Sequence, residues 1–154
     1  MKAVIQRVNF ASVEIEGEIF AKIEKGYLIL LGVSVTDDET DSEILSDKIS
    51  KLRIFTDEND KMNLSIMDVG GSALVISNFT LYANCSHGNR PDFLDSAKPD
   101  ISKPLYEKFL RDLSSLGVPT YCGQFGADMK VSLENDGPIT VVLESEQLKK
   151  KSRR

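Results

Sequence analysis

The chain is poor in the side chains that usually carry enzyme chemistry. Its 154 residues include one histidine, two cysteines and no tryptophan. Two thiols do not form a disulfide framework, and with a single histidine they do not supply the close set of about four ligands that a zinc site needs. We therefore expect no metal and no cofactor. Chemistry in this chain must depend on main-chain polar groups, hydroxyls or the substrate itself.

The single histidine also argues against a Ser–His–Asp triad, which needs a positioned imidazole. His87 lies in a loop-like stretch, Ser-His-Gly-Asn. That context is typical of an exposed side chain, with a catalytic base as the alternative. The sequence contains neither a phosphate-binding P-loop nor a Gly-x-Gly-x-x-Gly fingerprint.

A long apolar run is missing as well. No stretch approaches the ~18 apolar residues of a membrane-spanning helix, and residues 1–7 lack a signal-peptide pattern. We therefore predict a cytoplasmic protein with no membrane partner. The hydrophobic content of 41% and charged content of 28% are typical of one globular domain, which we place at residues 1–145. A disordered basic tail is expected at 146–154, with a weak phosphate contact as the alternative.

The chain has no excess of positive charge, because its formal net charge is −5. Proteins that grip a long nucleic-acid backbone do so by neutralising phosphates. The charge therefore argues against such a protein and against a DNA partner. It does not exclude a protein that handles only the end of a nucleic acid.

Alternating or continuous apolar segments predict several β-strands. They lie at residues 2–8, 11–16, 19–23, 27–33, 53–55, 73–79, 129–133 and 139–143. The segment 27–33 is continuously apolar, which is typical of a strand buried on both faces, and 73–79, whose first four residues are apolar, is predicted to be a second strongly buried strand.

Two segments have the spacing of amphipathic helices. The first covers residues 40–52, with Thr40 or Asp41 as its N-cap, and the second has Pro104 in its first turn and Gly117 at its end. Together with the strands, they predict a mixed α/β fold. In it, mainly antiparallel or mixed sheets are covered on one face by two helices.

Residues 77–81 (Ser-Asn-Phe-Thr-Leu) end one of the apolar strands. The backbone N–H groups of Phe79 and Thr80 could stabilise a developing oxyanion there. The Thr80 hydroxyl could act as a nucleophile, although no base is visible to activate it. An ordinary strand end is the alternative.

Residues 135–140 (Asn-Asp-Gly-Pro-Ile-Thr) separate the last two predicted strands. Glycine has no Cβ, so a ligand can approach the Gly137 carbonyl closely. A bond preceding proline adopts cis at modest cost, and a cis bond before Pro138 would aim two neighbouring carbonyls into a pocket. Carbonyls only accept hydrogen bonds, so this pair suits an ammonium group. A plain hairpin turn is the alternative.

At these motifs the chain resembles the D-aminoacyl-tRNA deacylases of the bacterial and eukaryotic type. Other blocks that carry the resemblance lie at 5–8, 11–13, 30–33, 53–55, 61–64, 90–93 and 127–133. The family's hallmark segments are Ser-Gln-x-Thr-Leu and Asn-x-Gly-Pro-x-Thr. The second is complete here, whereas the first has Asn78 in place of glutamine. A hydrogen bond that needs the longer side chain must therefore shift or pass through water.

The resemblance implies a homodimeric hydrolase, without a cofactor, that releases tRNA and a D-amino acid from D-aminoacyl-tRNA. Its catalytic segment would consist of Ser77, Asn78, Phe79 and Thr80. The free 2′-hydroxyl of the terminal ribose would assist the attacking water. Covalent attack by Thr80 is the alternative.

The resemblance also implies how the tRNA 3′ end is bound. Gly137 and Pro138 would reach into the partner's pocket and capture the α-ammonium, with Arg7 holding that segment. Phe125 and Met129 would lie near the terminal adenosine, with core packing as their alternative. The crowded pocket would reject L-aminoacyl groups, and achiral glycine mischarged on tRNA(Ala) would be a second substrate.

Two other functions remain open at this point. The exchange at Asn78 allows a tRNA 3′-end binding or editing module with altered specificity or weak catalysis. A structural dimer with no RNA role is the third hypothesis.

Overall fold

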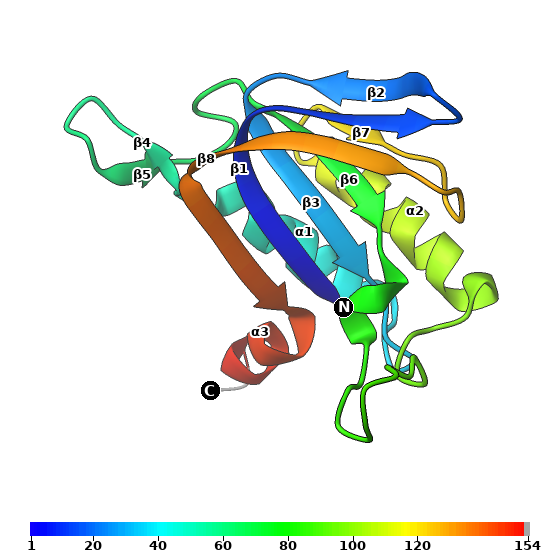
Figure 1. Cartoon of the computed structure of the whole chain (residues 1–154). Coiled ribbons are helices and arrows are strands. Elements are labelled where there is room, and N and C mark those ends of the chain that lie inside the picture. The colour runs from blue at the N-terminus through cyan, green and yellow to red at the C-terminus, as the bar shows by residue number, and fades with distance from the viewer. Residues whose placement is uncertain (153–154) are drawn as a thin grey trace.

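The computed structural model describes residues 1–152, which form a mixed six-stranded sheet, a small hairpin and flanking helices (Figure 1). The strands are β1 (Lys2–Ile15), β2 (Glu18–Ile23), β3 (Gly26–Gly32), β4 (Phe55–Thr56), β5 (Met62–Leu64), β6 (Ser72–Ser77), β7 (Thr120–Cys122) and β8 (Lys130–Glu144). The helices are α1 (Glu39–Lys51), the 3-10 helix η1 (Phe79–Tyr82), α2 (Pro99–Ser115) and α3 (Ser145–Ser152). This architecture confirms the predicted mixed α/β class.

β1 organises the sheet because three strands pair with it. Its first half pairs antiparallel with β3, its second half pairs antiparallel with β2, and β8 runs antiparallel along its other side. β6 and β7 extend the sheet beyond β3 in parallel. The sequence predicts separate strands at 2–8 and 11–16. The structure has one strand, because β8 offers a partner to both halves.

β3 and β6 are buried on both faces, as their apolar sequences predict. One face, which includes Tyr27, packs into the main core with the helices. The opposite face, which includes Leu28 and Leu74, packs into a second core under the second half of β1. At Gly26 the two strands are so close that a Cβ would lie 1.7 Å from the Ser72 carbonyl oxygen, so the position requires glycine.

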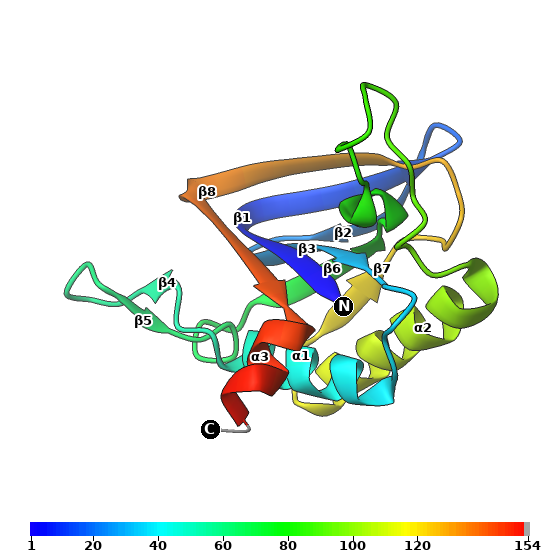
Figure 2. The ribbon, with the colours of Figure 1, turned by 90° about the horizontal axis from the view of Figure 1, so that it is seen from below.

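α1 and α2 pack together over one face of the sheet (Figure 2). The predicted N-cap of α1 is wrong: Asp38 takes that position, its side chain accepting the Thr40 N–H while the Asp41 carboxylate accepts the Asp38 N–H. This reciprocal pair is a capping box. The start of α2 is also earlier than predicted. Pro99 suits the first turn, and Pro104 lies inside the helix.

α3 packs beside α1 and is attached to it through Asp41. This carboxylate is 2% exposed and accepts the Ser145 hydroxyl at 2.6 Å and the Lys149 ammonium at 2.9 Å. The tail expected to be disordered at 146–154 is therefore helical over its described part, and residues 153–154 lie outside the described residues. No helix in the described chain combines the length and apolarity that a bilayer crossing requires.

Candidate active site

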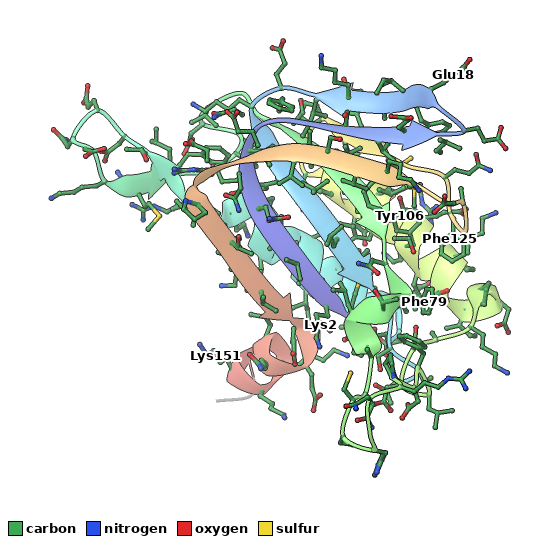
Figure 3. The ribbon with its side chains drawn as sticks, in the orientation of Figure 1. Lys2, Glu18, Phe79, Tyr106, Phe125 and Lys151 are labelled. Atoms are coloured by element: carbon green, nitrogen blue, oxygen red, sulfur yellow. The ribbon has the colours of Figure 1, made fainter. Side chains whose placement is uncertain are left out.

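A cavity of about 460 Å³ opens where β6 ends and η1 begins. The predicted site residues that line it are Ser77, Asn78, Phe79, Phe125 and Met129. Figure 3 shows Phe79, from η1, and Phe125, from the segment before β8, on the same side of the molecule. A cavity of this volume accommodates a ligand of small-molecule size. The structure thus joins one of the two sequence motifs to the two residues expected near adenosine.

Aromatic rings form much of the cavity wall. Phe79, which is 56% exposed, meets Phe93 edge to face with 5.1 Å between ring centroids. The ring centroids of Phe125 and Tyr106 are 5.9 Å apart, and the Tyr106 hydroxyl donates to the Val75 carbonyl at 2.8 Å. Burial raises the pKa of Tyr106, so its hydroxyl stays protonated as a fixed donor. Sequence reasoning missed Phe93, although an aromatic residue within a long polar loop was a signal.

The main-chain donors at η1 are not equally available. A helix begins with N–H groups that lack intrahelical acceptors. Asn78 caps this one: its side-chain oxygen lies 3.3 Å from the Thr80 nitrogen, and its carbonyl accepts the Leu81 N–H at 3.4 Å. The Phe79 N–H has no acceptor among the described residues. Of the two N–H groups predicted to face an oxyanion, that of Phe79 is therefore the open one.

Carboxylate and imidazole side chains are missing from the cavity wall over the residues that the structure describes. Among its described lining residues, Lys98 is the one charged side chain, and histidine, aspartate and glutamate are missing. His87 is exposed in its loop and does not line the cavity. The described residues also contain no cluster of three His, Cys, Asp or Glu side chains that could hold a metal.

The second motif forms a corner in β8 and is not a hairpin turn. Gln6 of β1 pairs with Thr140, and Val8 pairs with Asn135, so β8 uses three more residues than β1 over this step. Such an excess is a β-bulge, which bends the strand and redirects its side chains. The prediction of two separate strands is therefore wrong, and so is the alternative of a hairpin turn, because both halves of β8 pair with the same strand. The Gly137–Pro138 bond at this corner is cis.

Asn135 stabilises the corner from within. Its side-chain oxygen accepts the Ile139 N–H and its side-chain nitrogen donates to the Thr140 hydroxyl, each at 2.9 Å. Gly137 has φ +133°, and a Cβ there would meet Cγ1 of Ile139 at 2.8 Å. The motif's asparagine, glycine and threonine thus each have a structural reason, while Gly137 and Pro138 remain exposed.

Arg7 holds this corner from the neighbouring strand. Its Nε donates to the Asp136 carbonyl at 3.1 Å, and one terminal nitrogen lies 3.4 Å from the Asp136 carboxylate. Its other terminal nitrogen donates to the Ile54 carbonyl at 2.9 Å and to the Thr56 hydroxyl at 3.2 Å. The contact with Asp136 is one that the expected role of Arg7 requires, and that role stays a prediction. The contacts with the β4–β5 hairpin had no signal in the sequence.

The two motifs do not meet within one chain. Gln6 of β1 pairs with Thr140 of β8 on one side and with Leu28 of β3 on the other, and Leu28 pairs with Leu74 of β6. Thr140 and Leu74 therefore lie at the same level across the sheet, and Leu74 is three residues before Ser77. Three residues along the sheet and three strand spacings across it separate the motifs by on the order of 15–20 Å. In Figure 1 the corner of β8 lies at the left edge of the sheet, on the far side of β1 and β3 from β6.

Comparison with known proteins places these features in one family. A sequence model of the family described as D-Tyr-tRNA(Tyr) deacylase matches residues 4–144. A D-aminoacyl-tRNA deacylase of Fusobacterium nucleatum is 52% identical over 145 residues, which cover 94% of this chain and 96% of that protein. One from Thermosipho africanus is 51% identical over 148 residues, covering 96% of this chain and 99% of that protein.

A solved structure has the same fold. The chain superposes with a TM-score of 0.87 on a protein named c-Myc DNA Unwinding Element Binding Protein. The two are 40% identical, and the match covers 94% of this chain and 98% of that one. From the match of the family model and from relatives this similar over nearly their full length, the chain belongs to the D-Tyr-tRNA(Tyr) deacylase family.

Proposed function

We propose that this chain hydrolyses the ester bond of D-aminoacyl-tRNA and releases free tRNA and the D-amino acid. Relatives about half identical over nearly the whole chain carry the name of this activity. The observation that carries the proposal is that both hallmark motifs are present but lie apart within one chain, on strands three positions from each other in the sheet. A second copy is needed to complete each site.

The active enzyme is accordingly a homodimer. The Gly137–Pro138 corner is exposed on an isolated chain, and in the dimer it enters the partner's cavity beside residues 77–80. Its carbonyl oxygens accept hydrogen bonds from the α-ammonium of the aminoacyl group. Exposed Phe79, together with Phe125 and Met129, receives the terminal adenosine, because aromatic and thioether side chains stack well on bases.

Selection between enantiomers works by exclusion. The partner's corner holds the ammonium in one direction, so the side chain of a D residue points to open space while that of an L residue meets the pocket wall. Discrimination of this kind comes from a clash built against the wrong substrate. Glycine has no side chain to clash, so glycine mischarged on tRNA(Ala) is also hydrolysed.

The reaction uses water as the nucleophile. Its oxygen forms a bond to the ester carbon, the bond to the ribose 3′-oxygen breaks, and one water proton ends on that 3′-oxygen. The Phe79 N–H stabilises the developing oxyanion. Because the described cavity lining offers no carboxylate or imidazole, the 2′-hydroxyl of the substrate's ribose orients the water.

Only the 3′ end of the tRNA enters the cavity, which is compatible with the net charge of −5. A relative's name refers to DNA. We propose no DNA partner for this chain, because duplex binding needs many phosphate contacts. The substrate is cytoplasmic, and we assign the protein to the cytoplasm with no membrane partner.

The direct test compares purified protein on D-Tyr-tRNA and L-Tyr-tRNA. We expect rapid deacylation of the D substrate and a rate near background with the L substrate. Equal rates, or no activity on the D substrate, would refute the proposal.

A second candidate is a tRNA 3′-end binding module with weak catalysis or altered specificity, and the family exchange at Asn78 favours it. The variant Asn78→Gln separates the two candidates. A large gain in deacylation would mean that the natural asparagine limits catalysis, whereas an enzyme adapted to Asn78 gains little.

A further inference from the structure

The β4–β5 hairpin projects from the body of the molecule on the same side as the β8 corner (Figures 1 and 2). Only short strands pair within it, Phe55 with Leu64 and Thr56 with Met62. Two-stranded hairpins of this size have little stability of their own. Its position relative to the sheet must therefore come from contacts at its base.

One such contact is aromatic. Phe55 is 2% exposed, and its ring stacks on that of Tyr27 in β3 with centroids 5.2 Å apart and planes 28° from parallel. Tyr27 pairs across the sheet with Arg7, so ring and guanidinium lie on the same face. The inward Phe55 thereby fixes its two chain neighbours beside the guanidinium.

Those neighbours are the hairpin's acceptors for Arg7. The Ile54 carbonyl lies 2.9 Å and the Thr56 hydroxyl 3.2 Å from the same terminal nitrogen. Arg7 is 8% exposed, so each acceptor replaces water that the guanidinium has lost. On its other edge, Arg7 contacts both the carbonyl and the carboxylate of Asp136. The guanidinium is thus held on two opposite edges, by acceptors of the hairpin on one edge and by Asp136 of the corner on the other.

We propose that the β4–β5 hairpin positions the Gly137–Pro138 corner through Arg7, with Thr56 as the positioning residue that sets the guanidinium's direction. This inference rests on the proposed function, in which the corner completes the partner's pocket. The corner is exposed and bulged, so the contacts of the neighbouring Asp136 with Arg7 limit its movement. Without the hairpin's acceptors, the guanidinium can rotate away from Asp136 and release the corner.

The test uses Thr56→Val, which keeps the shape of the side chain but removes the acceptor. Thr56 is exposed, so the protein is expected to fold. We expect amide hydrogen exchange in residues 135–140 to become about 3- to 10-fold faster, in keeping with the loss of one hydrogen bond of ordinary strength. Thr56→Ser retains the hydroxyl and restores slow exchange. Thr120→Val removes a side-chain hydrogen bond elsewhere, to the Val118 carbonyl at 2.8 Å, and leaves exchange in this segment unchanged.

Kinetics on D-Tyr-tRNA give the second readout. Because the corner binds the ammonium in ground state and transition state alike, we expect Thr56→Val to raise KM by about 3- to 10-fold with kcat within about twofold. An exchange rate and a KM equal to those of the wild type would overturn the inference. If the valine variant does not fold, Thr56→Ala takes its place in both measurements.

The two proposals fail in different ways. If the wild-type protein has no deacylase activity, the proposed function is refuted. Hydrogen exchange then still tests whether the hairpin restrains residues 135–140. An active wild type with an unaltered Thr56→Val variant removes only the positioning role.

Discussion

The side-chain oxygen of Asn78 accepts the hydroxyl of Thr80 at 2.5 Å. An amide oxygen is not a base at neutral pH, so this hydrogen bond occupies the hydroxyl without activating it. The geometry therefore speaks against covalent attack by Thr80, an alternative that the sequence leaves open.

We predict that Thr80→Val keeps deacylase activity within about threefold, whereas loss of a true covalent nucleophile costs on the order of 10⁴-fold or more. Single-turnover rates with D-Tyr-tRNA would measure the difference. Trapping of an aminoacyl-enzyme in the wild type would contradict a water mechanism.

The same side chain gives a second prediction. Asn78 caps η1, and truncating an N-cap to alanine costs about 1 kcal/mol of local stability. We expect Asn78→Ala to loosen η1, to misalign the Phe79 N–H and to lower kcat/KM by about 5- to 10-fold. Asn78→Ser is the matched control, because serine caps helices as well as asparagine does. If serine and alanine impair the enzyme equally, capping is not the reason.

A third prediction concerns Gly137. A Cβ at this position meets Cγ1 of Ile139 at 2.8 Å, so Gly137→Ala must displace the corner. We expect at least about a tenfold loss of kcat/KM on D-Tyr-tRNA, because a displacement of about 1 Å in a binding group has effects of this order or larger. Gly70→Ala is the control: Gly70 also has a positive φ, +65°, but nothing lies within 4 Å of its Cβ position. Equal activities of Gly137→Ala and Gly70→Ala would show that the corner is not part of the site.

Lys98 provides a prediction about the RNA. As the one charged side chain on the described cavity wall, it is placed to contact a phosphate of the 3′ end. We expect Lys98→Gln to raise KM by about 2- to 5-fold and to flatten the salt dependence of binding by about 0.7 in log–log slope, the value for one phosphate contact on a single strand. Lys103→Gln, on an exposed part of α2, should leave both unchanged. An unaltered salt slope for Lys98→Gln would place the phosphate elsewhere.

Asp41 governs a prediction about acid stability. Burial acts to raise the pKa of Asp41, but hydrogen bonds from Ser145, from the Asp38 N–H and from Lys149 outweigh it and bring the pKa to about 2 instead of 3.8. A folded-state pKa below the unfolded value stabilises the protein above about pH 4, and this stabilisation is lost as the pH falls towards 2. We expect it to amount to about 2 kcal/mol.

Denaturant unfolding at fixed protein concentration measures this effect. Asp41→Asn should lower the free energy of unfolding at pH 7, and its difference from the wild type should shrink between pH 4 and pH 2. Asp47→Asn is the control, since Asp47 pairs with Lys51 on the exposed surface of α1. A difference that stays constant over this pH range would assign the loss to packing and not to the charge.

Much of the fold follows from the pattern of neighbouring residues. The apolar runs predict that β3 and β6 are buried on both faces. Glycine is typical of the position after a helix, and Gly117, with a left-handed φ of +102°, ends α2 in this way. The helix starts were harder to predict. Several residues near each start suit a cap or a first turn: Asp38 is the one that completes a capping box with Asp41, and Pro99 and Pro104 both suit a first turn.

The candidate site also has features that the sequence reveals and features that it does not. The two motifs stand out in the sequence because unusual residue types, glycine before proline and hydroxyls beside an aromatic residue, interrupt apolar strands. The acceptors of Arg7 on the β4–β5 hairpin do not stand out. A backbone carbonyl is present at every position, so nothing in the residue Ile54 marks it as a partner of Arg7.

By itself, the sequence determined the mixed fold class, the two doubly buried strands and the two motifs, because these depend on the period of apolar residues and on the chemistry of glycine, proline and hydroxyl groups over a few neighbouring positions. Only the tertiary structure decided that residues 130–144 form one bent strand, and that the corner and the end of β6 lie on strands three positions apart in the sheet. The physical reason is that strand pairing is non-local. β1 and β8 are far apart in the chain, and the register between them, which local propensity does not encode, sets where each side chain points.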